Sequence, residues 1–250
     1  MNSTHVLTSS VAVAVLIAVH LLAGYFDRWR GRWRPLFFSV AGGVTVAYVV
    51  MQLLPALSRS DQTIRPLAQQ FLPFFERHGY FLAVIGIVVF YANANQIARS
   101  RAQQVQLAGE DQADRRAFAT SMVLMSIFNF TVAYSLADPR DPDVRPIVLF
   151  VVALALFYFV ADESLHSNYA RDYRRVGRWV LASALAIGWL FGSFTELPAS
   201  VLALLVAFFS GGILVTVLGQ QLRPGPSRNV WGFALGALGY GLLLMLLQLG

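Results

Sequence analysis

The sequence contains no cysteine and no lysine, and it has few charged residues of any kind. The absence of cysteine excludes disulfides, thiolate metal sites and cysteine nucleophiles. Charged residues make up 13% of the 250 residues and hydrophobic residues 57%, whereas soluble domains have about 25% and roughly 45–50%. This composition predicts an integral membrane protein with the lipid bilayer as its main partner.

Motifs of known enzyme chemistry are also absent. The chain has no phosphate-binding glycine loop, no Gly-x-Ser-x-Gly and no His-Glu-x-x-His. No acid, base and nucleophile stand in a recognisable pattern, so we predict that the protein is not an enzyme. An intramembrane enzyme that uses His20 or Asp162 is the weaker alternative.

Apolar segments fill most of the chain, and most of them are near the roughly 20 residues that span a bilayer. Proline marks their ends, since Pro35 and Pro146 precede segments and Pro55 closes one. The first segment has no basic residue before it and is predicted to be a spanning helix rather than a signal peptide. We therefore predict an all-α, polytopic membrane domain over residues 1–250 with eight spans. The spans are 9–26, 36–57, 80–97, 117–137, 147–161, 177–194, 199–222 and 230–249.

Arginine is distributed unevenly between the predicted connections. Fourteen arginines fall on one side of the membrane and five on the side that holds both termini. The positive-inside rule places the arginine-rich side in the cytoplasm and both termini on the periplasmic or extracellular side. Membrane topology thus accounts for the basic charge, and no nucleic-acid partner is expected.

One phrase occurs twice in the sequence. "AGGVTVAYVVMQLLP" (41–55) and "SGGILVTVLGQQLRP" (210–224) share a Gly-Gly pair, and they also share Gln and Pro at the same distances from it. The two copies fall on the second and seventh predicted spans, which cross the membrane in opposite directions. This arrangement predicts an inverted repeat that relates spans 1–3 to spans 6–8.

Together, the eight spans, the 3+2+3 arrangement and the Gly-to-Pro frames ending in "QLLP" and "QLRP" resemble the ZIP family of divalent metal transporters. "MSIFNFTVAYS" (125–135) resembles the family's His-x-x-x-(Asp/Glu)-Gly-x-Ala segment in outline. The resemblance implies a divergent bacterial member in the inner (cytoplasmic) membrane, with a divalent metal as substrate and no resident cofactor. A homodimer is left open.

The positions that match metal ligands of the family hold poor ligands. Met125 and Asn129 stand at the His and acidic positions of the fourth span, and a thioether and a carboxamide bring no charge to a divalent cation. Gln52 and Gln221 stand three residues before the prolines of the two frames. On the fifth span, Tyr158 and Asp162 form the i, i+4 pair that keeps one plausible ligand.

Two further residues, His20 and Asp162, each have alternative interpretations at this point. His20, about two thirds through the first span, makes an interhelical hydrogen bond or has a proton or ligand role. Asp162 is expected at the membrane interface, paired with Arg174 or Arg175, although His166 one turn later would complete a two-ligand face.

These observations predict a transporter of a divalent cation or small solute that uses a degenerate pathway between spans 2, 4, 5 and 7. The alternative is a ZIP-fold protein that has lost transport and serves as a structural or partner-binding subunit. The substrate-pathway candidates are Gln52, Met125, Asn129, Tyr158, Asp162, Gln221 and His20, and the weak metal candidates are Asp162, His166 and Met125.

Overall fold

The computed structural model describes residues 3–26, 33–68, 78–109, 111–138, 147–221 and 229–248, and these form helices and short connections without any strand. The all-α prediction is confirmed for this part of the chain. The α-helices are α1 (Ser3–Phe26), α2 (Arg34–Tyr48), α3 (Leu54–Ala68), α4 (His78–Ala108), α5 (Arg115–Ala137), α6 (Ile147–Asp172), α7 (Arg178–Phe194), α8 (Ala199–Gln221) and α9 (Val230–Gln248). Two π-helical turns, η1 (Val49–Leu53) and η2 (Tyr173–Gly177), join α2 to α3 and α6 to α7.

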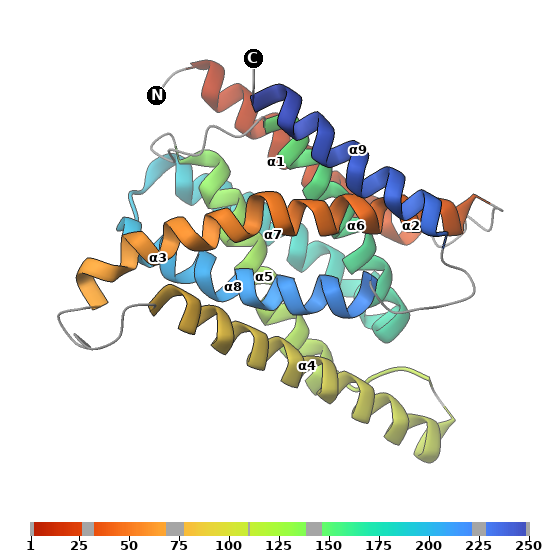
Figure 1. The fold of residues 1–250 in the computed structure, drawn as a ribbon. Helices are drawn as coiled ribbons and strands as arrows, with labels where there is room; N and C mark the ends of the chain where they lie inside the picture. The colour runs from red at the N-terminus through yellow and green to blue at the C-terminus, as the bar shows by residue number, and fades with distance from the viewer. Residues whose placement is uncertain are drawn as a thin grey trace.

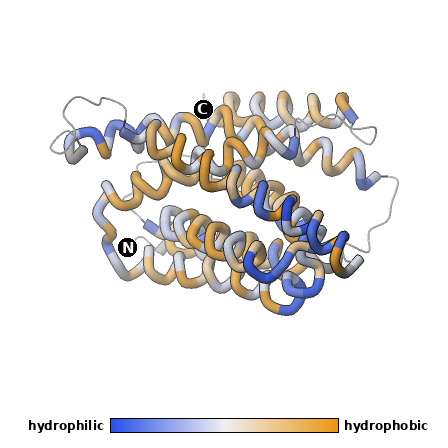
Figure 2. Tube along the Cα trace, turned by 90° about the horizontal axis from the view of Figure 1, so that it is seen from below, coloured by the Kyte–Doolittle hydropathy of each residue, from blue (hydrophilic) through white to orange (hydrophobic). Residues whose placement is uncertain are grey.

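Seven helical stretches of the described chain are long and apolar enough to cross a membrane. The seven count α2, η1 and α3 as one stretch, and α6, η2 and α7 as another of 48 residues. Figure 2 shows hydrophobic residues along the bodies of the helices and hydrophilic residues gathered toward their ends. The fold is therefore that of a multi-pass helical membrane protein.

A kink in the backbone lies near the C-terminal end of α6, shortly before α7. Tyr169 has non-helical dihedral angles, with φ −141° and ψ 37°. The π turn that follows ends where the Arg178 N–H bonds to the Tyr173 carbonyl, five residues back. The chain reverses direction here, so that α6 and α7 run in opposite senses (Figure 1).

The π turn η1 lies directly before a proline. The Leu54 N–H bonds to the Val49 carbonyl, five residues back. Pro55 has no N–H, so the carbonyl of Met51 receives no helical bond from it. The helix continues past this turn to Ala68, so the second stretch extends well beyond the predicted end at residue 57.

Each helix that carries a copy of the repeated phrase packs against a different partner helix. α2 packs against α9, and α8 packs against α4, while α1 lies against both α6 and α7. Two glycines of the phrase allow these approaches. A Cβ on Gly43 would collide with the Phe233 carbonyl of α9, and one on Gly211 would collide with the Ala83 carbonyl of α4.

Candidate functional site

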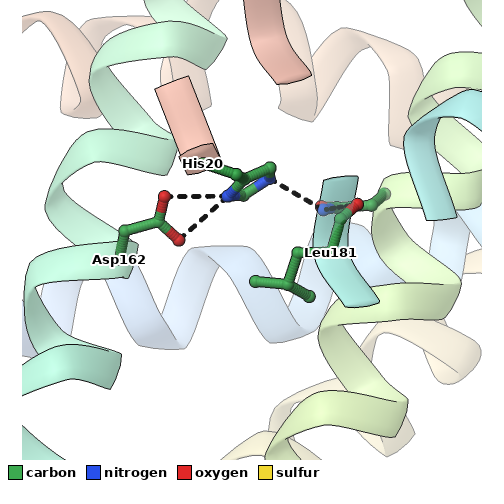
Figure 3. Close-up of polar contacts among 4 residues, drawn as sticks. His20, Asp162 and Leu181 are labelled. Carbon is green, nitrogen blue, oxygen red and sulfur yellow. Dashed lines mark hydrogen bonds and ion pairs between the residues drawn. The ribbon is translucent and has the colours of Figure 1, made fainter. Parts of the chain in front are cut away.

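A chain of hydrogen bonds between three helices lies at the centre of the bundle (Figure 3). His20 of α1 contributes the imidazole, Asp162 of α6 the carboxylate and Asn129 of α5 the carboxamide. His20 Nδ1 lies 2.8 and 3.0 Å from the two Asp162 oxygens, and His20 Nε2 lies 2.9 Å from Asn129 Nδ2. All three residues have 0% exposure. Three of the predicted site residues are thus directly connected.

The partners of Asn129 fix the proton on His20. Asn129 Nδ2 also lies 3.2 Å from the Leu181 carbonyl oxygen of α7, which can only accept. The amide nitrogen therefore donates to both Leu181 and His20 Nε2. Because Nε2 accepts, the ring carries its proton on Nδ1 and donates it to Asp162.

Tyr158, another predicted residue, lies against the same imidazole. Its ring centroid is 4.6 Å from that of His20, with 35° between the planes. The Tyr158 hydroxyl and Asn129 Oδ1 are buried, and neither has a hydrogen-bond partner within the described part of the chain. Unpaired buried polar atoms are costly, so these two oxygens mark a place where a further polar group would be stabilised.

The remaining candidates lie around this centre or apart from it. Met125, one turn before Asn129 on α5, is partly buried and packs with two hydrophobic clusters. His166 is buried one turn after Asp162, and its ring lies 6.3 Å from that of Tyr173. Gln221 packs against Gly42 of α2. The structure therefore gathers His20, Asn129, Tyr158 and Asp162 and does not place Met125 or Gln221 in their hydrogen-bond chain.

The last candidate, Gln52, faces a cavity. Gln52 lies in η1, is 6% exposed, and neither atom of its carboxamide has a hydrogen-bond partner among the described residues. The cavity has a volume of about 370 Å³ and lies between α2, η1, α3, α5 and α8, with Phe150 of α6. The lining residues with polar side chains are Tyr48, Gln52, Arg59, Ser60, Thr63, Thr131, Ser135, Asp138 and Ser210.

Aromatic side chains separate the cavity from the buried hydrogen-bond chain. Phe128 lines the cavity, and its ring centroid lies 6.1 Å from that of Tyr158, in an edge-on arrangement. Tyr158 in turn contacts His20. Cavity, aromatic layer and buried polar centre thus follow one another across the bundle.

The expected pairing of Asp162 with Arg174 or Arg175 is wrong. α6 continues to Asp172 instead of ending at residue 161, so Asp162 falls well inside the helix. Its partner is His20 rather than Arg174 or Arg175. The neighbouring Glu163 forms an ion pair with Arg34 at the start of α2. The apolar run ends at residue 161, but a helix buried by its neighbours does not need to end where its sequence turns polar.

Metal coordination finds little support in the described residues, which hold no group of three or more His, Asp or Glu side chains that could bind a metal ion. Between α5 and α6 the imidazole of His20 fills the space between Asn129 and Asp162. The residues present at this position therefore do not fit a divalent metal as cargo.

Comparison of the chain with protein-family models, with curated proteins and with solved structures gives no match.

Proposed function

We propose that the protein crosses the membrane eight times in a ZIP-like 3+2+3 arrangement. The stretch Ile147–Phe194 would extend about 72 Å as one straight helix, more than twice the roughly 30 Å of a bilayer core. The kink at Tyr169 and the opposite directions of α6 and α7 support two crossings (Figure 1).

Reciprocal packing supports the inverted repeat. If α1, α2 and α4 correspond to α7, α8 and α9, then the contact of α2 with α9 corresponds to that of α8 with α4. The contact of α1 with α6 likewise corresponds to that of α7 with α5. A glycine of the repeated Gly-Gly pair lies at a close approach in each contact, Gly43, the second of its pair, in one and Gly211, the first of its pair, in the other.

We further propose that the protein carries a small polar solute, and the cavity at Gln52 is the observation that carries this proposal. The cavity lies between the helices that correspond to predicted spans 2, 4, 5 and 7. Binding sites of secondary transporters lie where repeats meet. An unpaired, buried carboxamide beside such a cavity has an NH₂ group that can donate and an oxygen that can accept hydrogen bonds from a ligand.

The lining favours a neutral cargo over a divalent cation. Its charged side chains are one arginine, Arg59, and one aspartate, Asp138, whose formal charges cancel. The other polar groups are hydroxyls and the Gln52 amide. A divalent cation that loses water needs carboxylate ligands to offset desolvation, whereas a neutral polar solute needs only hydrogen bonds.

Solute entry into proteoliposomes tests this proposal. Purified protein should speed the osmotic reswelling of liposomes in glycerol or urea, measured by stopped-flow light scattering. Gln52→Leu should lower the added permeability at least tenfold, because the cavity loses its buried hydrogen-bonding group. The matched control Gln62→Leu changes an exposed residue of α3 and should keep the wild-type rate. Reswelling no faster than that of empty liposomes for either solute would refute the carrier.

The alternative is a ZIP-fold protein without transport, which serves as a structural or partner-binding subunit. One observation favours it: His20 closes the space between α5 and α6, and aromatic rings separate that space from the cavity. On this alternative, Gln52→Leu leaves the cellular phenotype unchanged, whereas substitutions on an exposed helix face disrupt a complex that copurifies with the protein.

A further inference from the structure

The polar groups that α5 and α6 point into the bundle are joined by a side chain from a third helix. His20 of α1 bonds to Asp162 with one ring nitrogen and to Asn129 with the other. The three side chains are fully buried. The imidazole is therefore the bridge between the two helices (Figure 3).

A carboxylate at this depth needs a partner, because burial of an unpaired charge is strongly unfavourable. A bound cation is one way to supply it, and a hydrogen-bond donor of the protein is another. His20 Nδ1 lies 2.8 Å from a carboxylate oxygen of Asp162 and is in position to donate a hydrogen bond to it. The Nδ1–H of His20 thus takes the role that a cation would have.

Two oxygen atoms beside the ring remain unused. Asn129 Oδ1 belongs to the carboxamide that bonds to His20, and the Tyr158 hydroxyl belongs to the ring that contacts His20 at a tilt of 35°. Neither has a hydrogen-bond partner within the described chain. Carboxylate, amide and hydroxyl oxygens are the donor types that hard cations prefer.

We propose that His20 is a built-in occupant of a cation-binding space formed by Asp162, Asn129 and Tyr158. In the native protein the imidazole excludes a metal ion from this space. Removal of the imidazole leaves a hole that accepts free imidazole or a hard divalent cation such as Mn²⁺. The inference is independent of solute passage, since this space lies beyond Phe128 from the cavity.

The test compares wild type with His20→Ala, His20→Ala/Asp162→Asn and the control His5→Ala, which removes a histidine near the start of the same helix. Thermal unfolding in detergent is measured alone, with imidazole and with Mn²⁺, and Mn²⁺ binding is measured by titration calorimetry. His20→Ala should lower the Tm by roughly 10 °C, because Asp162 loses its partner. Imidazole and Mn²⁺ should each recover at least half of that loss.

Mn²⁺ should bind His20→Ala at least tenfold more tightly than wild type. The double variant should respond to neither probe, because its site no longer carries a charge, and His5→Ala should behave as wild type. Mn²⁺ binding to the wild type that Asp162→Asn abolishes would overturn the proposal. A folded His20→Ala protein that responds to neither imidazole nor Mn²⁺ would overturn it as well.

If His20→Ala does not fold, two measurements still test the proposal. Recovery of folded protein only when imidazole is present during purification would support the proposal. Wild type and Asp162→Asn can be titrated with Mn²⁺ in any case, and wild-type binding that depends on Asp162 contradicts it. None of these results depends on glycerol or urea permeability, so failure of this inference is distinguishable from failure of the carrier.

Discussion

Asn129 sets the chemical state of His20 through the orientation of its amide. The Leu181 carbonyl requires the Asn129 nitrogen on its side, and the same nitrogen donates to His20 Nε2. His20 therefore accepts a hydrogen bond at Nε2 and donates one from Nδ1 to Asp162. A carboxamide at this position therefore contributes by directing a proton rather than by binding a metal.

Replacement of the Asn129 amide should lower the free energy of unfolding. Asn129→Leu leaves one buried acceptor unpaired, His20 Nε2, because the Leu181 carbonyl lies within α7 and keeps its helical partner. An unpaired buried group costs about 1–3 kcal/mol, so the free energy of unfolding should fall by about that amount. Thermal unfolding in detergent measures the change. Gln96→Leu, at an exposed position of α4, is the control and should stay within about 0.5 kcal/mol of wild type. Equal effects of the two substitutions would mean that the hydrogen bonds of Asn129 do not stabilise the fold.

Gln52 and Gln221 occupy equivalent places in the repeated phrase but have different surroundings. Gln52 faces the cavity with both amide atoms unpaired among the described residues. Gln221 packs against Gly42 of α2. Gln52 lies in the π turn that precedes Pro55, whereas Pro224, the equivalent proline, lies outside the described residues. The equivalent glutamines of the two copies therefore differ in role: one faces a cavity and the other packs against a neighbouring helix.

At the scale of single helices, close backbone contact is the main use of glycine in this fold. Gly211 of α8 meets the Ala83 carbonyl, and Gly86 of α4 meets the Phe208 carbonyl in return. Gly43 and Gly236 make the corresponding contacts between α2 and α9. The hydrophobic effect contributes little to helix association in lipid, because lipid tails are as apolar as the helix surfaces. Close van der Waals packing through small residues is therefore a main driving force.

Two glycines of α8 provide a matched pair of substitutions. Gly211→Ala places a methyl group against backbone atoms of α4 and should destabilise the protein by about 1–3 kcal/mol through overpacking. Gly219→Ala meets nothing within 4 Å and should leave stability unchanged or raise it by up to about 1 kcal/mol, because alanine favours helix. Thermal unfolding of both variants gives the comparison. A loss from Gly219→Ala as large as that from Gly211→Ala would show that contact with α4 is not the cause.

Across the whole molecule, the distribution of arginine and the directions of the helices agree with one another. α1 begins and α9 ends toward the same end of the bundle (Figure 1). An even number of crossings requires that arrangement. The excess of arginine in alternate connections then predicts which end faces the cytoplasm.

Cysteine labelling tests the topology directly, because the chain has no cysteine of its own. Thr4→Cys and Leu247→Cys introduce thiols near the two ends of the chain, and Leu107→Cys introduces one near the end of α4. All three positions are exposed. An impermeant maleimide added to intact cells should label the first two variants and should label Leu107→Cys only after permeabilisation. Labelling of Thr4→Cys and Leu247→Cys from opposite sides would exclude eight crossings.

The sequence by itself determined the helical membrane class and the positions of the apolar segments, because the length and hydrophobicity of a run are local properties. It also singled out His20, Asn129, Tyr158 and Asp162 as polar residues in apolar surroundings. It could not determine how far a helix continues beyond its apolar run, so Asp162 was expected at an interface.

Only the tertiary structure decided which polar residues meet. His20 lies 142 residues from Asp162 and 109 from Asn129, and no local pattern encodes contacts at such separations. The packing of α1 between α6 and α7 brings the imidazole to the two other side chains. A family motif indicates where a ligand would stand on its own helix, but the occupant of the space between helices is decided by the third helix that packs against them.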